Sequence, residues 1–198
     1  EELGEWAAQQ GVITAKTRCY AAEGQLSLSP VTDWLRSDVL QPHLAQLDAV
    51  WLTEVSRILP ELSTERSDLP RYEPVRYEPM SEHGQRQRFF ESLARAVLAA
   101  PQPLLLVIDD LQWCDQETLE WLHYLLRFDL AARVLLVGSA RVEETPWQHP
   151  LHALVLHTRN MASVTEIALD PLDAAETAKL AAQITSRELE VETAMRLY

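Results

Sequence analysis

With 198 residues, 47% of them hydrophobic and 24% charged, the chain has the size and composition of a globular domain with one sizeable core. No apolar run approaches the roughly 20 residues that span a bilayer, which argues against a membrane segment. A formal net charge of −13 argues against direct contact with nucleic acid, because phosphate contacts need clustered lysine and arginine. We therefore expect a cytoplasmic domain that contacts neither nucleic acid nor membrane.

The first half of the chain alternates between strand and helix patterns. Apolar residues near the start recur at helical spacing, and Gly11 is placed to end that helix. Proline at position 30 suits the first turn of a later helix. In chain order, we expect a helix over 1–10, a strand over 12–20, a helix over 29–39, a helix over 47–59, a loop over 60–82 and a helix over 83–100.

The expected loop contains a short tandem repeat. The sequence Arg-Tyr-Glu-Pro occurs at 71–74 and again at 76–79. Each proline favours extended geometry in the glutamate before it, so we expect no helix here. The repeat predicts a surface loop, and a recognition loop is the alternative.

A strand pattern that ends in two carboxylates is the most informative segment. Five aliphatic residues, 104–108, lead directly to Asp109 and Asp110. Ligands of open α/β sheets bind outside the carboxyl ends of the strands, and Mg²⁺ is held by one or two carboxylates together with substrate phosphates. The pattern predicts such a site. An ordinary central strand whose terminal acids cap the next helix is the alternative.

The second half continues the alternation of helices and strands. Asp115 is expected to cap the following helix, because an acid at this position suits the helix dipole. Alternation at this spacing predicts an α/β fold with a parallel sheet. After that helix we expect a strand over 133–138, a last strand over 164–169 and a helix over 174–184 capped by Asp173.

Residues 109–115, with the sequence DDLQWCD, have the form of a Walker B motif. They closely resemble the DDLHWAD version found in the STAND branch of the AAA-related P-loop ATPases, which occurs in bacterial transcriptional regulators of the LuxR and SARP types. The resemblance implies a three-layer P-loop NTPase-like fold with ATP and Mg²⁺ as cofactors. It places the α/β core in residues 1–158 and the last strand with the start of a helical lid in residues 159–198.

The same resemblance implies roles for five residues. Asp109 would bind Mg²⁺ through water, and Asp110 would polarise the attacking water. Arg141 would face the γ-phosphate, with Ser139 as a second candidate on that side. Pro171 would open the lid and touch the base or ribose of the nucleotide. A capping role for Asp110, a surface charge at Arg141 and a simple turn at Pro171 are the alternatives that the residues themselves leave open.

No phosphate-binding loop is encoded in the sequence. A P-loop needs G-x-x-x-x-G-K-S/T, and none of the five glycines lies in that pattern. In the family this loop directly precedes a helix, so we expect it upstream of Glu1 and expect the chain to be part of a longer protein. The expected function is an ATP-binding and ATP-hydrolysing switch in a multidomain signalling or transcriptional regulator.

Effector domains would then lie elsewhere in that protein, and self-association could depend on nucleotide. A non-catalytic protein-interaction module that retains the ATPase fold is the alternative function. Two further expectations concern residues outside the motif. Cys114 should be a small packing residue rather than half of a disulfide framework. His149, His152 and His157 match no zinc pattern and should be solvated loop residues.

Overall fold

The computed structural model describes residues 2–21, 26–62, 81–159 and 164–185. The chain divides into two compact units, Glu1–Asn160 and Met161–Tyr198, and each is described by itself. The tandem repeat at 71–79 lies outside the described residues. In the described part of the chain, no helix is long and apolar enough to cross a membrane.

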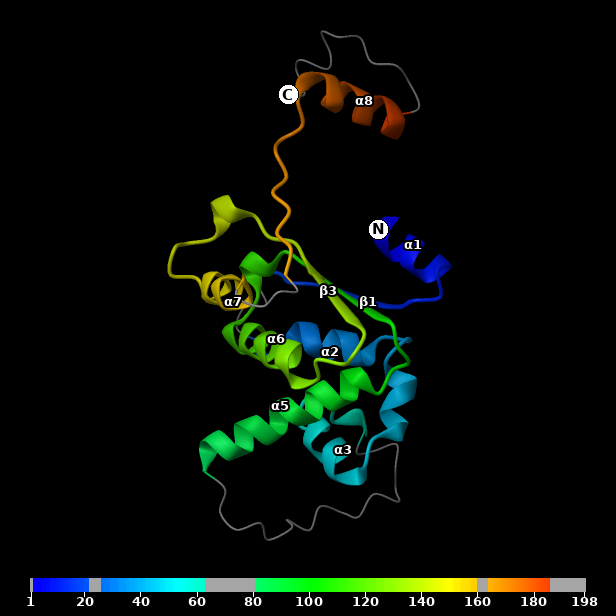
Figure 1. Ribbon diagram of the computed structural model, residues 1–198, viewed down its shortest axis with the longest axis vertical. Helices are drawn as coiled ribbons and strands as arrows, with labels where there is room; N and C mark the ends of the chain where they lie inside the picture. Colours follow the sequence, from blue (N-terminus) through cyan, green and yellow to red (C-terminus); the bar gives the residue numbers. More distant parts are fainter. Residues whose placement is uncertain (1, 22–25, 63–80, 160–163, 186–198) are drawn as a thin grey trace. The chain divides into compact units, whose positions relative to one another are not determined.

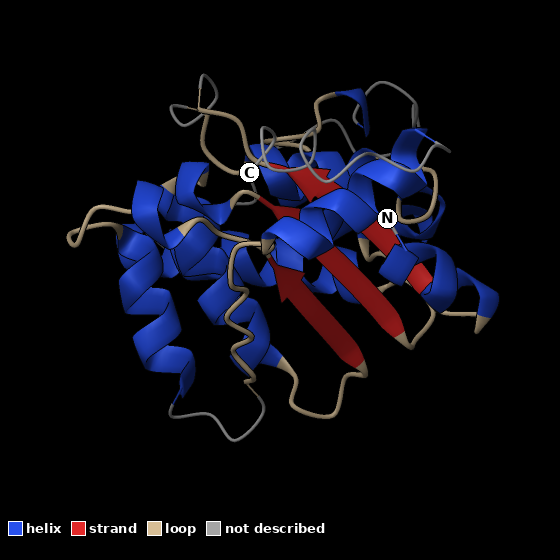
Figure 2. Ribbon diagram, turned by 90° about the horizontal axis from the view of Figure 1, so that it is seen from above, coloured by secondary structure: helices blue, strands red, loops and turns tan. Residues whose placement is uncertain are grey.

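Three parallel strands form the sheet of the first unit, as the sequence predicts (Figure 2). The central strand is the apolar one that ends in the acid pair, and it is largely buried. Because all three strands run in the same direction, their carboxyl ends lie at one edge of the sheet. The strands, in spatial order, are β1 (Ile13–Arg18), β2 (Leu104–Asp109) and β3 (Val134–Gly138).

Helices cover the sheet and build a core beside it (Figure 1). Most positions agree with the sequence patterns, but the helices expected over 29–39 and 47–59 end early, at Arg36 and Val55, and the helix Pro150–Arg159 was not predicted. The α-helices of this unit are α1 (Glu2–Gln9), α2 (Ser29–Arg36), α3 (Ala49–Val55), α5 (Glu82–Leu98), α6 (Gln116–Phe128) and α7 (Pro150–Arg159). Short 3-10 helices are η1 (Gln41–Gln46), η2 (Leu111–Trp113) and η3 (Val142–Glu144).

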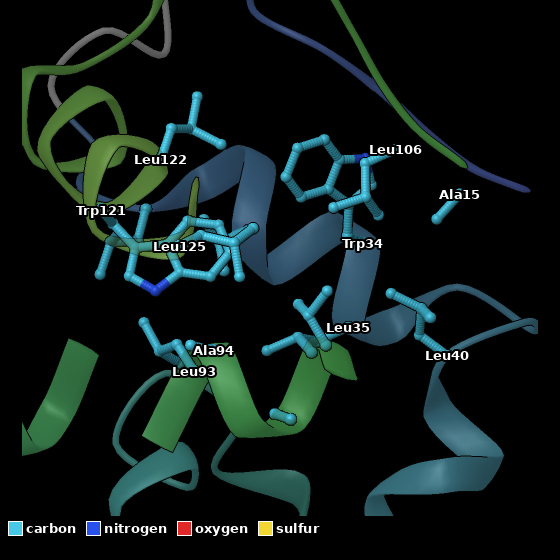
Figure 3. Packing of buried hydrophobic residues seen from close by; sticks show 14 of the residues in the cluster. Ala15, Trp34, Leu35, Leu40, Leu93, Ala94, Leu106, Trp121, Leu122 and Leu125 are labelled. Atoms are coloured by element: carbon cyan, nitrogen blue, oxygen red, sulfur yellow. The ribbon is translucent and has the colours of Figure 1, made fainter. Parts of the chain in front are cut away.

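Two tryptophans anchor the core between α2 and α6 (Figure 3). The rings of Trp34 and Trp121 are fully buried, with their centroids 6.5 Å apart. Each indole N–H finds a backbone acceptor, since Trp34 donates to the carbonyl of Val107 and Trp121 to that of Phe90, both at 3.2 Å. These large buried rings hold the helices against β2 and thereby fix the acid pair at its end.

The start of α6 is fixed by a buried cap. Asp115 Oδ1 accepts from the backbone N–H of Thr118 at 2.9 Å, as the sequence predicts for a capping acid. The same oxygen accepts from the N–H of Leu28 at 3.3 Å, while Thr118 Oγ1 donates to Asp115 Oδ2 at 2.6 Å. Cys114, just before the cap, is buried as a packing residue. The turn after the acid pair is therefore tied to the segment that precedes α2.

The prediction of solvated loop histidines was wrong for two of the three residues, since only His149 lies in a loop. His152 and His157 lie on α7, and the ring of His157 stacks on that of His123 with centroids 5.3 Å apart. The helix begins at Pro150, a residue whose fixed φ suits a first turn. The stacked rings of His123 and His157 thus form part of the contact between α6 and α7.

In the second unit, the predicted strand over 164–169 is not formed. These residues have no regular secondary structure, and Ile167 and Leu169 are exposed. A strand needs a neighbour for its backbone hydrogen bonds, and the described residues of this unit contain none. The predicted helix is present as α8 (Ala174–Thr185), and its cap is reciprocal. Asp173 Oδ1 accepts from the N–H of Glu176 at 2.8 Å, and Glu176 Oε2 accepts from the N–H of Asp173 at 2.9 Å.

Candidate functional site

Charged and polar side chains gather at the carboxyl edge of the sheet. Asp109 and Asp110 end the central strand, and Ser139 and Arg141 follow β3. Four of the five predicted site residues therefore lie on neighbouring segments of the first unit. Pro171 belongs to the second unit, where it is exposed, and its role stays a prediction.

The first carboxylate, Asp109, is held by contacts from both neighbouring strands. Ser139 Oγ donates to Asp109 Oδ1 at 3.1 Å, and Lys16 Nζ lies 3.3 Å from Asp109 Oδ2. Its side chain keeps 34% of its surface exposed. The carboxylate is therefore oriented by the protein and still accessible to a hydrated cation.

The second carboxylate, Asp110, occupies an unusual backbone conformation. Its φ of 62° and ψ of 48° lie in the left-handed region, which aspartate tolerates better than most residues. The Nε and Nη2 atoms of Arg18 both lie 2.6 Å from Oδ2, and Gln112 Nε2 donates to Oδ1 at 3.1 Å. These bonds, that of Arg18 first, lower the pKa of Asp110. Asp110 is thus an ionised acceptor with both oxygens engaged.

Ser139 connects the two acids to β3. Its hydroxyl accepts from the N–H of Asp110 at 3.1 Å while it donates to Asp109. Its carbonyl accepts from the N–H of Leu111 at 2.8 Å, and its own N–H donates to the carbonyl of Ile108 at 3.1 Å. In this structure Ser139 positions the acid pair, and its predicted contact with nucleotide stays a prediction.

Arg141 lies close enough to the acid pair for its charge to lower the pKa of Asp110 further. Its guanidinium is nonetheless bound to Glu144, with Nη1 2.8 Å from Oε1, and that contact raises the pKa of Arg141. The backbone N–H of Arg141 donates to Gln112 Oε1 at 3.1 Å. Its side chain is 61% exposed, so the guanidinium can exchange Glu144 for another anion.

The turn after the acid pair packs closely on the end of β3. A Cβ atom added to Gly138 would lie 2.4 Å from Leu111 Cδ1, which is nearer than real Cβ atoms come to a neighbour. Leu111 Cδ1 is the end of a flexible side chain, so a larger residue at position 138 would force Leu111 to change its rotamer.

Four members of the site were not predicted from the sequence: Lys16, Arg18, Gln112 and Gly138. Lys16 and Arg18 are two residues apart on β1, so they share a face of the strand. Parallel pairing places Arg18 opposite Asp109. The Lys-x-Arg spacing in a short strand was the available signal, because an acid pair at a sheet edge needs neighbouring cations.

The donor set fits a water-mediated Mg²⁺ rather than a metal held by protein alone. Among the described residues, no three or more His, Cys, Asp or Glu side chains are placed to hold a metal together. Mg²⁺ needs fewer protein ligands, since it keeps several waters and takes oxygens from substrate phosphates. The accessible carboxylate of Asp109 supplies the hard oxygen that this cation prefers.

Comparison with known proteins identifies a family. The model of the AAA ATPase domain family matches residues 1–137. The matched region runs from α1 into β3 and includes both acids, Lys16, Arg18 and Gln112, whereas Ser139 and Arg141 follow it. No curated protein and no solved structure matches the chain.

Proposed function

Because this chain belongs to the AAA ATPase domain family, we propose that it supplies the Walker B side of an ATP-binding and ATP-hydrolysing switch. The observation that carries the proposal is the acid pair at the carboxyl edge of a parallel sheet, oriented by Lys16, Arg18 and Ser139. The switch would act within a multidomain signalling or transcriptional regulator of the STAND type, with effector domains elsewhere in the protein.

Each acid has a distinct part in this proposal. Asp109 would hold Mg²⁺ through water, and the cation would neutralise charge on the phosphates of ATP. Asp110 would orient the attacking water as a hydrogen-bond acceptor. Its lowered pKa keeps it ionised near neutral pH, which suits orientation of water better than strong proton abstraction.

Asp110 Oδ2 already accepts from two nitrogens of Arg18, and Oδ1 accepts from Gln112. The attacking water would use the remaining lone pair of Oδ1, or it would displace Arg18 from Oδ2. Arg18 is suited to such displacement, because 55% of its surface is exposed and solvent competes for exposed ion pairs. The arrangement described here would correspond to the resting state of the switch.

Local cations would compensate for the charge of the chain. A net charge of −13 repels ATP at long range. Lys16, Arg18 and Arg141 balance the charges of three carboxylates at this edge, those of Asp109, Asp110 and Glu144, so the edge itself does not add to the repulsion. Arg141 would turn from Glu144 to the γ-phosphate, a task suited to a guanidinium with its planar set of donors.

The phosphate-binding loop would come from residues upstream of Glu1, since the sequence contains no P-loop pattern. The test is titration calorimetry with ATP and Mg²⁺ on a chain extended upstream by about 40 residues, the length of a strand, loop and helix. We expect tight binding that is lost when the P-loop lysine is replaced. Absence of binding in the extended chain would refute the proposal.

A non-catalytic interaction module is the second candidate function. One observation favours it: both oxygens of Asp110 already accept hydrogen bonds from protein side chains. Light scattering of the calorimetry samples separates the candidates further. A nucleotide switch would change its self-association when ATP is added, whereas an interaction module would show the same mass with and without nucleotide.

A further inference from the structure

Gln112 is a buried polar residue in an otherwise exposed part of the site. It lies in η2, two residues after Asp110, and only 3% of its surface is exposed. Both ends of its amide are paired. Nε2 donates to Asp110 Oδ1 at 3.1 Å, and Oε1 accepts from the backbone N–H of Arg141 at 3.1 Å. A buried amide with both ends used is costly to replace, because any substitute leaves a polar partner unsatisfied.

The two partners of Gln112 belong to different sides of the proposed reaction. Asp110 is on the side of the attacking water, and Arg141 is on the side of the γ-phosphate. Ser139 also joins the two segments, but its hydroxyl meets the backbone N–H of Asp110. Gln112 is the residue among those described that meets the carboxylate of Asp110 and the loop of Arg141 at once.

We propose that Gln112 is a positioning residue that couples the carboxylate of Asp110 to the backbone of Arg141, so that the two sides of the site move together. The catalytic meaning of this coupling rests on the proposed function, whereas the coupling itself is a property of the chain. A shift of the Asp110 carboxylate would rotate the amide and release the Arg141 loop. Movement of that loop would in turn free one oxygen of Asp110.

The first test compares Gln112→Leu with Gln116→Leu in the 198-residue chain by NMR, without nucleotide. Gln116 is an exposed glutamine on the next helix whose amide meets Glu120, so it serves as the matched control. In the Gln112→Leu variant we expect hydrogen exchange at the Arg141 amide to be faster by on the order of tenfold. We also expect the pKa of the Asp110 carboxyl to rise, because a donor to the ionised form is lost. Unchanged values in Gln112→Leu would overturn the proposal.

A second variant, Gln112→Glu, separates the two bonds and retains the size of the side chain. A glutamate oxygen can still accept from Arg141, so the Arg141 amide should stay protected. The new carboxylate cannot donate to Asp110 and repels it, so the pKa of Asp110 should rise. Loss of protection at Arg141, or an unchanged pKa at Asp110, would contradict the assignment of the two bonds. This variant keeps the test decisive if Gln112→Leu does not fold.

Coupling is measured most directly with Asp110→Gly, since glycine tolerates the left-handed backbone of this position. Removal of the carboxylate should speed exchange at the Arg141 amide in the parent chain and have little further effect in Gln112→Leu. Equal effects in both backgrounds would mean that Gln112 transmits nothing.

The final readout is ATP turnover by the upstream-extended chain, where Gln112→Leu should lower kcat by about tenfold to a hundredfold with KM changed less than about threefold. A loss confined to KM would overturn the positioning role. If the extended chain hydrolyses no ATP but the exchange results hold, the proposed function fails and the coupling stands.

Discussion

Arg18 and Asp110, separated by 92 positions in the sequence, form an ion pair of 2.6 Å across the ends of two neighbouring parallel strands. The guanidinium approaches one carboxylate oxygen with two of its nitrogens. This contact joins the strand that carries the cations to the strand that carries the acid pair. It also stabilises the ionised form of the acid to which we assign the attacking water.

Replacement of Arg18 by glutamine should raise the pKa of Asp110, because the largest stabilisation of its ionised form is lost. The free energy of unfolding near neutral pH should change little, since exposed ion pairs contribute little to stability. A titration of the side-chain carboxyl by carbon-13 NMR measures the pKa. Arg36→Gln is the matched control, because Arg36 lowers the pKa of Glu61 in a similar pair away from the site. A carboxyl of Asp110 that titrates alike in the Arg18→Gln variant and the parent would contradict the assignment.

The sign of the pH dependence follows from the same shift. A carboxyl whose pKa is lowered in the folded state stabilises that state above its ordinary value of 3.8. The contribution is lost as the pH falls through the lowered value. We therefore expect Arg18→Gln to lower stability slightly near neutral pH, where the contribution is present, and to match the parent once the pH is below the lowered value.

The parts of the site that could be predicted from sequence are those fixed by local chemistry. Asp109 and Asp110 directly follow an apolar run in the sequence. Asp115 is the helix cap, and it accepts from the backbone N–H three residues later, at Thr118. Arg18 could not be placed, because its contact with Asp110 depends on which strands pair and in which register. Local sequence patterns carry little information on pairing between segments so far apart.

The unformed strand over 164–169 and the role of Gln112 also depend on contacts between segments that are distant in the sequence. Residues 164–169 have the composition of a strand, but a strand forms only beside a partner, and the described residues of their unit provide none. Gln112 was read as part of a motif and not as a site residue. Its two hydrogen bonds depend on the return of the chain at Arg141 after β3.

Gly138→Ala should destabilise the first unit by about 0.5 to 1.5 kcal/mol, because Leu111 must leave its rotamer to make room for the new methyl group. Chemical denaturation measures the change in the free energy of unfolding. The double variant Gly138→Ala with Leu111→Ala removes the overlapping side chain. It should therefore recover the part of the lost stability that is due to overlap. Gly4→Ala is the control, since a Cβ there meets Thr14 at an ordinary 3.7 Å and lies in a helix. Equal stability of Gly138→Ala and the parent would show that the turn does not need the glycine.

Acidification should loosen the contact between α6 and α7. Burial first, and then the charges of His157 and Arg127, lower the pKa of His123. A histidine with a lowered pKa stabilises the folded state above its ordinary value of 6.5, and this contribution is lost as the pH falls through the lowered value. The experiment compares hydrogen exchange of the α7 amides at about pH 7.5 and about pH 5.5.

We expect protection of α7 to fall several-fold at the lower pH, after correction for the intrinsic pH dependence of exchange. His123→Phe retains a ring beside His157 and removes the titrating group, so it should reduce the loss. The same substitution at the exposed His83 should leave the loss as in the parent. If α7 loses as much protection in the His123→Phe variant as in the parent, His123 is not the cause of the pH effect. Another histidine would then be responsible, for example His149, whose pKa is also lowered by burial.

The proposal that Asp110 orients the attacking water is tested by ATP turnover of Asp110→Asn in the upstream-extended chain. ATP binding is measured on the same sample. Asparagine tolerates the left-handed backbone of this position but lacks the negative charge that would orient the attacking water. We expect kcat of this variant to fall by at least about a hundredfold, with a Kd for ATP within about threefold of the parent. Unchanged turnover would show that Asp110 does not polarise the attacking water.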